Sequence, residues 1–381
     1  MNILHIIPGD NFTEGMTYKD NFLSHFNAKH GHNVLILSSC ATWKNSKIEY
    51  QLPCDIIMEN GVRLVRLEYK KIFNNYVTKK LRILKNVDQA IEDFQPEVIR
   101  VLNPHNFTLP IIARYKREHP SVKLYIDSHQ DYFNSGIGFL SYWVFHKILV
   151  GRMLRKELRN IDKVFYCQEG VKIFLKEMYK IPEENMEFFP LGGVIMEEEQ
   201  RISAKNRIRK ELGIGDNEIM MVHSGKMSAG KRTKEILEAL QELKSGMLKL
   251  VIIGSIPDDM EAILKPLIEA DKRVLYLGWK SGNELIEYLC AADLYLQPGT
   301  ASVTVTQALC CGTAVVVAPD IKGYDIYLRG TGWYGKNKED LKLIFEQILK
   351  KPTLLKDMGK IALIIAREKL DYEVLASRLY Q

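Results

Sequence analysis

Cysteine is scarce in this sequence, and the arrangement of the few that occur excludes two classes of protein. The six cysteines form no C-x-x-C pair and have no histidine at zinc-ligand spacing: Cys40, Cys54, Cys167, Cys290, Cys310 and Cys311. A disulfide-stabilised scaffold and a zinc module would both need regularly spaced cysteines. We therefore expect free, mostly buried thiols in a cytoplasmic protein.

Long hydrophobic runs are also lacking. The longest, "IGFLSYWVFHKILVG" from Ile137, is interrupted by His146 and Lys147, and a membrane-spanning helix needs about 20 consecutive apolar residues. The first ten residues, "MNILHIIPGD", have no basic segment of the kind that begins a secretory signal peptide. Both features favour a cytoplasmic location.

Positive charge is too weakly concentrated for a nucleic-acid-binding protein. The net charge is +6, no recognition motif occurs, and residues 1–190 hold 26 Lys and Arg against 21 Asp and Glu. This excess is interpreted either as solvated helix faces or as a contact with an anionic acceptor or the inner face of the cytoplasmic membrane. Seven residues of "FLSYWVFHKILVGRMLRKELRN" would make that contact: Phe139, Leu140, Trp143, Arg152, Arg155, Lys156 and Arg159.

What the chain does have is an alternation of short apolar runs and amphipathic stretches, which predicts an α/β protein with parallel, doubly wound sheets. Strands are expected at "NILHIIP", "NVLILSS", "VRLVRLEY", "EVIRVL", "KLYID" and "KVFYC", and again at "EIMMVHS", "KLVIIGS", "RVLYLG", "DLYLQP" and "AVVVAP". Helices are expected between most of them, including one over residues 81–94. Pro190, Gly192 and Gly193 mark a break. We predict Rossmann-like domains at 1–192 and 193–365 that face a cleft, with a C-terminal helix at 366–381 packing back on the first.

The stretch "VHSGKMSAGKRTKEIL" has the glycine and lysine spacing of a phosphate-binding P-loop but lacks its last residue. Gly225, Gly230 and Lys231 match G-x-x-x-x-G-K, whereas Arg232 stands where a metal-ligating Ser or Thr is required. The following strand candidate ends at Gly254 rather than at an acidic residue. A strand-to-helix turn with Lys226 and Lys231 would still attract an anion. We therefore expect these lysines to neutralise a diphosphate, without a metal.

These residues resemble the G-R-L-x-x-x-K segment of the retaining GT-B glycosyltransferases of family 4, with Lys226 in place of the usual Arg. The resemblance covers most of the chain. "MNILHIIPGDNFTEGMTYKDNFLSHFNAKHGHNVLILSS" is similar to the opening strand, glycine loop and "GHxV" strand of that family, and "VLYLGWKSGNELIEYLCAADLYLQPG" and "QALCCGTAVVVA" follow two later motifs. It implies a GT-B fold and transfer of a sugar from a nucleoside diphosphate donor with retention, in bacterial surface polysaccharide or glycoconjugate assembly.

One segment departs from the family pattern. The resemblance implies an E-x7-E segment here, but "GTASVTVTQ" has Gly299 at the first glutamate and Gln307 at the second. Gln307 can still hydrogen-bond a ribose hydroxyl, whereas Gly299 cannot replace a carboxylate near the donor sugar. Residues of this loop are expected to bind phosphate or sugar hydroxyls instead, or else simply to cap the helix that follows: Thr300, Ser302, Val303 and Thr304.

The resemblance also implies roles in the first domain and at the nucleotide base. His129 is implied to approach the reacting centre beside Asp127 and Asp131, either of which is interpreted as fixing its tautomer or as capping a turn. Gly15 is implied at the donor, and the acceptor side is expected to include Met16, Thr17, His105 and Asp131, with Glu14 and Asp20 as alternative bases. Gly278, Trp279 and Lys280 would meet the base, Trp279 either stacking on it or packing in the core.

The main hypothesis is therefore a metal-independent glycosyltransferase without a cofactor, in which His129, Lys226 and Lys231 are the catalytic residues. Its partners would be a nucleotide-sugar, with UDP favoured over GDP, and a carbohydrate or lipid-linked acceptor. Two alternatives remain at this point: a GT-B nucleotide-sugar epimerase, and a non-catalytic nucleotide-binding scaffold at a membrane.

Overall fold

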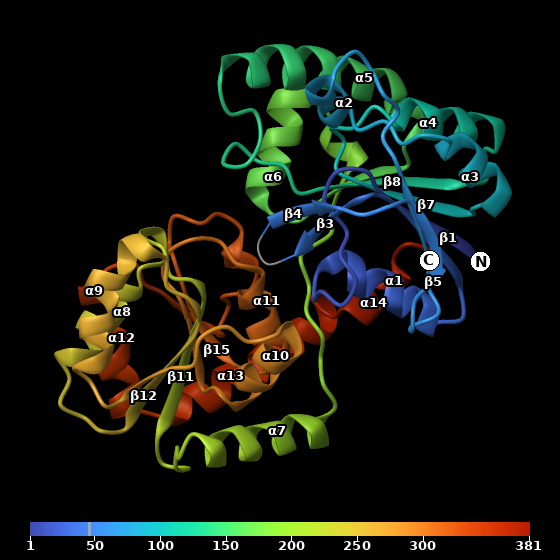
Figure 1. Ribbon diagram of the computed structural model, residues 1–381. Coiled ribbons are helices and arrows are strands. Elements are labelled where there is room, and N and C mark those ends of the chain that lie inside the picture. The colour runs from blue at the N-terminus through green and yellow to red at the C-terminus, as the bar shows by residue number, and fades with distance from the viewer. Residues whose placement is uncertain (45–46) are drawn as a thin grey trace. The chain divides into compact units, whose positions relative to one another are not determined.

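The computed structural model describes residues 1–44 and 47–381 and divides them into two units (Figure 1). Unit 1 consists of Met1–Pro190 together with Leu375–Gln381, and unit 2 of Leu191–Val374. The chain thus leaves unit 1 after Pro190 and returns to it within its last helix. Among the described residues, no helix combines the length and the apolar character that crossing a bilayer requires.

Unit 1 is built on an eight-stranded sheet in the order β10-β9-β8-β7-β1-β2-β6-β5, parallel except for β5 at one edge. The strands are β1 (Asn2–Ile7), β2 (Asn33–Ser39), β5 (Cys54–Ile57), β6 (Arg63–Leu67), β7 (Val98–Leu102), β8 (Lys123–Ser128), β9 (Lys163–Tyr166) and β10 (Met186–Phe188). Strands β3 (Ala41–Lys44) and β4 (Lys47–Tyr50) pair separately as an antiparallel ribbon. The antiparallel additions were not predicted from the sequence.

The helices of unit 1 follow the strands as the alternating pattern predicts. They are α1 (Lys19–Lys29), α2 (Asn75–Leu81), α3 (Val87–Phe94), α4 (Leu109–Glu118), the π-helical η1 (Leu140–Val150), α5 (Gly151–Glu157), η2 (Leu158–Asn160), α6 (Glu169–Phe174), η3 (Leu175–Tyr179), η4 (Glu183–Asn185) and α14 (Tyr372–Ser377), in which the chain returns from unit 2.

The prediction of a single helix over residues 81–94 is wrong, because α2 ends at Leu81 and α3 begins at Val87. Arg82 and Asn86 both have positive φ angles, of 53° and 55°, which end α2 and delay the start of α3. Between them Leu84 forms a bridge with Tyr69. A tertiary pairing therefore overrides the local helical pattern.

Unit 2 contains a fully parallel six-stranded sheet in the order β13-β12-β11-β14-β15-β16. Its strands are β11 (Ile219–Lys226), β12 (Leu248–Ser255), β13 (Val274–Tyr276), β14 (Leu294–Gln297), β15 (Ala314–Val317) and β16 (Gly332–Tyr334). Its helices are α7 (Glu198–Glu211), η5 (Ala229–Lys231), α8 (Thr233–Gln241), α9 (Asp258–Glu269), α10 (Gly282–Ala291), α11 (Val303–Cys310), η6 (Tyr324–Ile326), α12 (Lys338–Lys350) and α13 (Thr353–Lys369).

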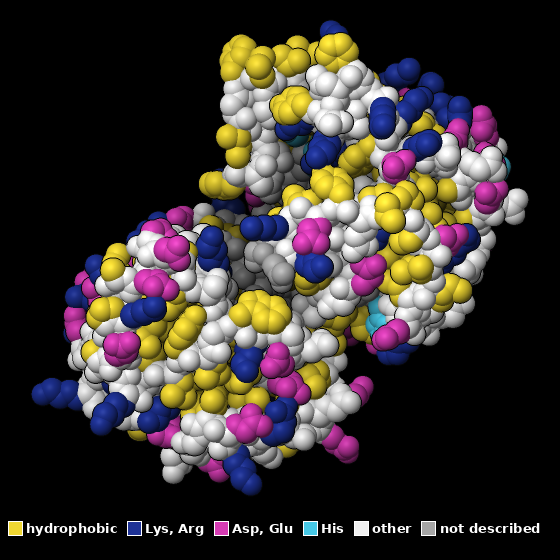
Figure 2. Space-filling model, viewed as in Figure 1, with side chains coloured by type: hydrophobic (Ala, Val, Ile, Leu, Met, Phe, Trp, Pro, Cys, Tyr) yellow, Lys and Arg dark blue, Asp and Glu magenta, His cyan; other side chains and the backbone are white. Residues whose placement is uncertain are grey.

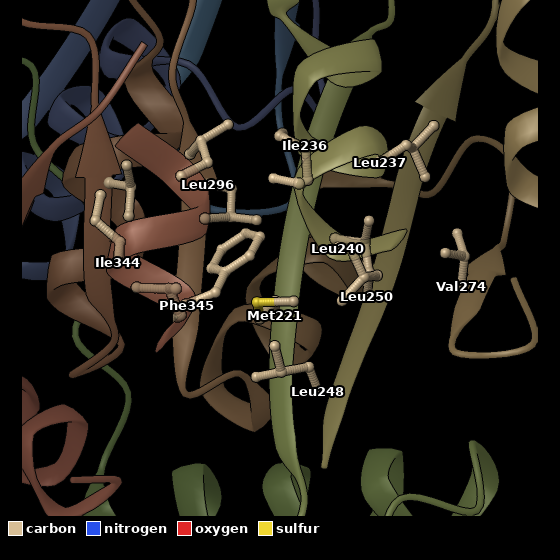
Figure 3. Close-up of a cluster of buried hydrophobic side chains, with 14 of the residues drawn as sticks. Met221, Ile236, Leu237, Leu240, Leu248, Leu250, Val274, Leu296, Ile344 and Phe345 are labelled. Atoms are coloured by element: carbon tan, nitrogen blue, oxygen red, sulfur yellow. The ribbon is translucent and has the colours of Figure 1, made fainter. Parts of the chain in front are cut away.

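Helices cover both faces of this sheet, with α8, α9 and α12 on one side and α10, α11 and α13 on the other (Figure 1). On the first side Met221 of β11 lies against Ile236 of α8 and Phe345 of α12 in one buried cluster (Figure 3). Strands buried on both faces read as continuous apolar runs, which is why "EIMMV" and "KLVII" were recognisable as strands. The core fixes the strand ends from which the candidate site is built.

Both sheets reverse their strand order beside their first strand. In unit 2 the order changes between β11 and β14, and in unit 1 between β1 and β7. Ligands of doubly wound folds bind outside the carboxyl ends of the strands at such a switch point. In unit 2 this position is bordered by the turn after β11 and by the loop after β14.

Candidate functional site

The turn after β11 carries the two lysines that the sequence singles out. Lys226 is the exposed last residue of β11, and Lys231 ends the short helical turn η5 before α8. Arg232, which replaces the P-loop hydroxyl, has a φ angle of +62° and pairs with Glu235 of its own helix at 2.8 Å. Arg232 therefore serves the start of α8, and the lysines remain as the cations of the turn.

Lys231 is held by polar groups at the ends of two neighbouring strands. Its Nζ donates to Oε1 of Gln297 at 3.1 Å and lies 3.4 Å from the carbonyl oxygen of Ser224. Gln297 is buried and in turn donates from Nε2 to the carbonyl of Thr300 at 2.6 Å. Burial lowers the pKa of Lys231 to about 8. A bound anion would stabilise the charged form of this side chain.

Glycines let the backbones around Lys231 approach closely. Gly225 has a φ angle of +120°, and a Cβ there would lie 3.1 Å from Nζ of Lys231. A Cβ at Gly299 would collide with the carbonyl group of Gly230 in the lysine turn. The loop after β14 packs directly on that turn and leaves no room for a side chain at position 299. This is why glycine stands where the E-x7-E pattern has its first glutamate.

The loop after β14 leads into α11 through a helix cap. Ser302 is the N-cap residue, and its hydroxyl accepts a hydrogen bond from the amide of Thr304 at 3.3 Å. The amide of Ser302 donates to the hydroxyl of Tyr324 at 3.1 Å. Thr300 and Val303 are exposed on this loop. Ser302 therefore caps the helix, which was one of the two interpretations, and the ligand role of the loop stays a prediction.

The amide of Gln307 is engaged within unit 2. Its Oε1 accepts from the backbone amide of Val194, and its Nε2 donates to the carbonyl of the same residue, both at 2.9 Å. The segment near the start of unit 2 is thereby tied to α11. The predicted hydrogen bond to a ribose would have to compete with this pair.

The predicted base-binding loop follows β13. Gly278 has a φ angle of +68°, and its carbonyl accepts from the amide of Gly254 at 2.7 Å. Trp279 is 74 % exposed, so it does not pack in the core, and its ring is open to stacking. Lys280 lies 3.6 Å from Glu284 on α10.

In unit 1, His129 follows β8 beside a buried ionic network. Its Nε2 lies 3.4 Å from Oδ1 of Asp127, and its backbone amide donates to Asn103 at 2.8 Å. Asp127 is fully buried and pairs with Lys19 at 2.8 Å and Arg100 at 2.6 Å. Although burial opposes ionisation, these two cations hold the pKa of Asp127 well below its usual range. His129 thus faces a carboxylate that stays ionised.

Sequence reasoning missed Lys19 and Arg100, although a signal existed for one of them. Arg100 is the only charged residue of the strand "VIRVL" and is fully buried, and a buried cation requires a partner. The two alternative bases are engaged by arginines: Asp20 lies 2.7 Å from Arg100, and Glu14 lies 2.6 Å from Arg66.

The remaining predicted residues of unit 1 lie in loops after strands. Gly15, with a φ angle of +75°, Met16 and Thr17 belong to the segment between β1 and α1. His105 follows β7 and is hydrogen-bonded to Arg82. Asp131 shapes a turn, because its Oδ1 accepts from the amides of Phe133 and Asn134 at 2.9 and 3.0 Å. Capping is therefore what Asp131 does in this structure.

The basic and aromatic segment of unit 1 exposes its apolar side chains. Phe139 is 75 % and Leu140 is 72 % exposed, so these two side chains do not complete the core of unit 1. Hydrophobic side chains gather at the upper left of the molecule in Figure 2, over the helix that leads into α5 in Figure 1. The basic residues of the segment's second half are also exposed: Arg152, Arg155, Lys156 and Arg159.

Comparisons with known proteins agree with this architecture. Residues 204–363 match the family model described as "Glycosyl transferases group 1". The chain is 24 % identical over 179 residues to alpha-galactosylglucosyldiacylglycerol synthase of Streptococcus pneumoniae (strain ATCC BAA-255 / R6), a match that covers 44 % of this chain and 46 % of the relative. The match therefore spans less than half the length of that relative.

Two solved structures resemble the whole chain. A glycosyltransferase from Rickettsia africae ESF-5 superposes with a TM-score of 0.71 at 14 % identity, covering 99 % of this chain and 96 % of that one. Anabaena HepE, solved in complex with UDP, gives a TM-score of 0.68 at 14 % identity and covers 100 % and 98 %. These findings show that the chain has the GT-B fold and that residues 204–363 match the Glycosyl transferases group 1 family.

Proposed function

We propose that the chain is a glycosyltransferase and that it transfers a sugar from a nucleoside diphosphate donor, UDP rather than GDP, to an acceptor hydroxyl with retention of configuration. The observation that carries the proposal is the half-buried ammonium group of Lys231 at the switch point of unit 2, held by Gln297 and lowered in pKa by burial. The partners of this ammonium group are a neutral amide and a carbonyl, and a diphosphate would supply the anion that pairs with it. Anabaena HepE, a structural neighbour, has been solved with UDP and with UDP-glucose.

Lys226 and Lys231 are proposed to neutralise the diphosphate together with backbone amides of the turn, so no metal is needed. In the transfer step the bond between the anomeric carbon and the diphosphate oxygen breaks, and the bond to the acceptor oxygen forms on the same face of the sugar. The acceptor proton passes to the departing diphosphate oxygen. The lysines lower the barrier by stabilising the charge that develops on that oxygen.

We propose a lipid-linked or otherwise anionic acceptor and a peripheral contact with an anionic membrane. The exposed apolar face of η1 and the four exposed basic residues that follow it support this contact. The name of the Streptococcus pneumoniae relative, a diacylglycerol glycolipid synthase, also supports a lipid acceptor. Assembly of a bacterial surface polysaccharide or glycoconjugate would fit such a substrate.

The donor assignment is tested by isothermal titration of UDP, GDP and their sugars into the unmodified chain and two variants. Lys231→Ala is expected to weaken UDP binding about 10- to 100-fold, because a charge-assisted hydrogen bond is worth about 1.5–3 kcal/mol. Lys234→Ala is the matched control, since this exposed lysine of α8 pairs with Glu238. Equal affinities in all three proteins would refute the diphosphate site.

Turnover is then measured with labelled donor, with and without lipid acceptors, in EDTA. Retained anomeric configuration in the product, read by NMR coupling constants, supports the proposal. A new nucleotide-sugar formed without acceptor would indicate an epimerase, and tight donor binding without any turnover would indicate a scaffold. An absolute need for Mg²⁺ or Mn²⁺ would contradict the metal-free role of the lysines.

Membrane contact is measured separately by sedimentation with phosphatidylglycerol and phosphatidylcholine vesicles. Each basic side chain near an anionic surface contributes about 1 kcal/mol, so binding should be confined to the anionic vesicles and should weaken with salt. Equally negligible binding to both kinds of vesicle at low salt would remove the membrane from the proposal.

A further inference from the structure

A small cavity in unit 1 adjoins the turn after His129, because Asn134 of its lining donates to the carbonyl of His129 at 2.9 Å. Its volume is about 240 Å³, below the roughly 300–1,000 Å³ of sites that enclose a whole small molecule. Its polar lining includes Lys80 and Arg82 at the end of α2, His105 after β7 and His146 of η1. A cavity of this size suits one charged group of a ligand rather than the entire ligand.

The charge in this lining is all of one sign. No Asp or Glu occurs among the described residues that line the cavity. Asp131, in the adjoining turn, is already bonded to two amides of that turn and to Nε2 of Gln168 at 3.2 Å. Burial, followed by the charges of Lys80 and Arg82, lowers the pKa of His146 to about 4. No carboxylate therefore lines the cavity beside the two cations, and the one that interacts with Arg82, Asp10, lies outside the lining.

The protonation state of His105 can be deduced from its hydrogen bond to Arg82. A guanidinium group has only N–H donors, so Arg82 donates to Nε2 of His105, which must be a bare acceptor nitrogen. Burial and the neighbouring Arg82 charge lower the pKa of His105 well below its usual value, so the ring is neutral and carries its proton on Nδ1. The side chain of Gln130 also hydrogen-bonds this ring, and Nδ1 is buried. His105 therefore forms a neutral part of the cavity wall, and Lys80 and Arg82 supply its charged donors.

The border of the cavity is apolar. Ile137 and Phe145 take part in the lining, and Ile137 is 68 % exposed. The exposed Phe139 and Leu140 follow directly in the chain at the start of η1. A ligand that places an anionic group among Lys80, Arg82 and His105 would meet these apolar side chains with its next atoms.

We infer that this cavity binds the phosphate group of a phosphate ester whose apolar part lies along η1, as in a phospholipid or a lipid-linked phosphate. A phosphate offers several acceptor oxygens to the guanidinium and ammonium donors at once. The inference names the acceptor class of the proposed transferase and rests on that function only for the transfer step. Binding itself is independent of unit 2.

The test uses the full chain with Lys226→Ala and Lys231→Ala, so that the lysines of unit 2 cannot bind the probe. Dihexanoylphosphatidic acid below its micelle concentration, glycerol 3-phosphate and dihexanoylglycerol are each titrated calorimetrically. The phosphatidic acid should bind at least 10-fold more tightly than either fragment. Adding Lys80→Gln should weaken its binding about 10-fold or more.

Lys79→Gln is the matched control, because it removes the same charge from an exposed neighbouring residue that does not line the cavity. It should change the affinity less than twofold. Equal losses in the two variants, or no binding of any phosphate probe, would overturn the site. Glycerol 3-phosphate binding as tightly as the lipid would overturn the lipid part and assign a soluble phosphate ester.

Failure of this inference is distinguishable from failure of the proposed function. UDP binding by the unmodified chain without any phosphatidic acid binding refutes the cavity assignment alone. Phosphatidic acid binding that depends on Lys80, in a chain that binds no nucleotide, refutes the donor assignment alone.

Discussion

Nζ of Lys231 donates a hydrogen bond of 3.1 Å to Oε1 of Gln297, which joins the turn after β11 to the end of β14. The amide of Gln297 is neutral, so it orients the ammonium group without cancelling its charge. A carboxylate at the same place would pair with Lys231 and repel a diphosphate.

Gln297→Glu is therefore expected to lower UDP affinity at least 10-fold while the turn keeps its geometry. Isothermal titration measures the effect. Gln241→Glu, which makes the same charge change on the exposed end of α8, is the control and should alter the affinity less than twofold. An unchanged affinity in Gln297→Glu would mean that Lys231 does not meet the diphosphate.

Donor affinity should also fall as the pH rises. Burial lowers the pKa of Lys231 to about 8 in the free protein, so the side chain loses its charge as the pH passes through that value. UDP binding is expected to weaken progressively between pH 7 and pH 9.5, and Lys231→Ala should flatten this part of the profile. A profile that is the same in both proteins would contradict the assignment of the titrating group.

Lys231→Met is expected to stabilise the ligand-free protein. A lysine whose folded pKa lies below its unfolded value opposes folding at low pH, and this penalty disappears as the pH rises from about 8 towards the unfolded value of about 10.4. The gain near pH 6 should be about 1–3 kcal/mol, which raises the Tm by several degrees. Calorimetry at pH 6 and pH 10 checks the sign, since the gain should shrink at the higher pH. A gain that is equal at both pH values would point to packing rather than charge.

His129→Ala should lower kcat at least 10-fold and change the Kd for UDP less than twofold. The expected contacts of the nucleotide lie in unit 2, whereas His129 lies in unit 1 beside Asp127. Steady-state kinetics and titration of UDP separate the two effects. A loss confined to donor affinity, or a lowered Tm alone, would return His129 to a structural role.

Asp127→Asn should destabilise unit 1 by about 3–5 kcal/mol, because it leaves Lys19 and Arg100 buried without their shared carboxylate. Asp55→Asn is the matched control, since Asp55 forms an exposed pair with Arg63 and such pairs contribute about 0–1 kcal/mol. Denaturant unfolding compares the two. Similar losses in both variants would show that burial of the network adds nothing to its importance.

The strands of the two sheets could be predicted from the sequence, because strands that are buried on both faces form uninterrupted apolar runs, as in β11 and β12. The lysine turn was recognisable from the same local order. The hydrogen bonds between Gln307 and Val194 could not be predicted, because the two residues are 113 positions apart and nothing in the local sequence indicates their pairing. The role of Gly299 was also hidden, since it depends on the approach of two loops.

In unit 1 the errors have the same origin. The helix expected over residues 81–94 is interrupted because Leu84 pairs with Tyr69, a contact that local periodicity does not contain. The network of Lys19, Arg100 and Asp127 joins three elements, so the sequence of one segment does not show which charges pair. The antiparallel edge strand β5 gives only a short and exposed pattern.

Residues 375–381 belong to unit 1, and this affects the order in which the two units can finish folding during synthesis. Leu375, Ala376 and Leu379 are buried there, and Arg378 donates to the carbonyl of Phe188 at 2.8 Å. A ribosome releases all of unit 2 before it releases these residues. Unit 2 is therefore able to finish folding during translation, while unit 1, although begun first, keeps part of its core open until residues 375–381 emerge.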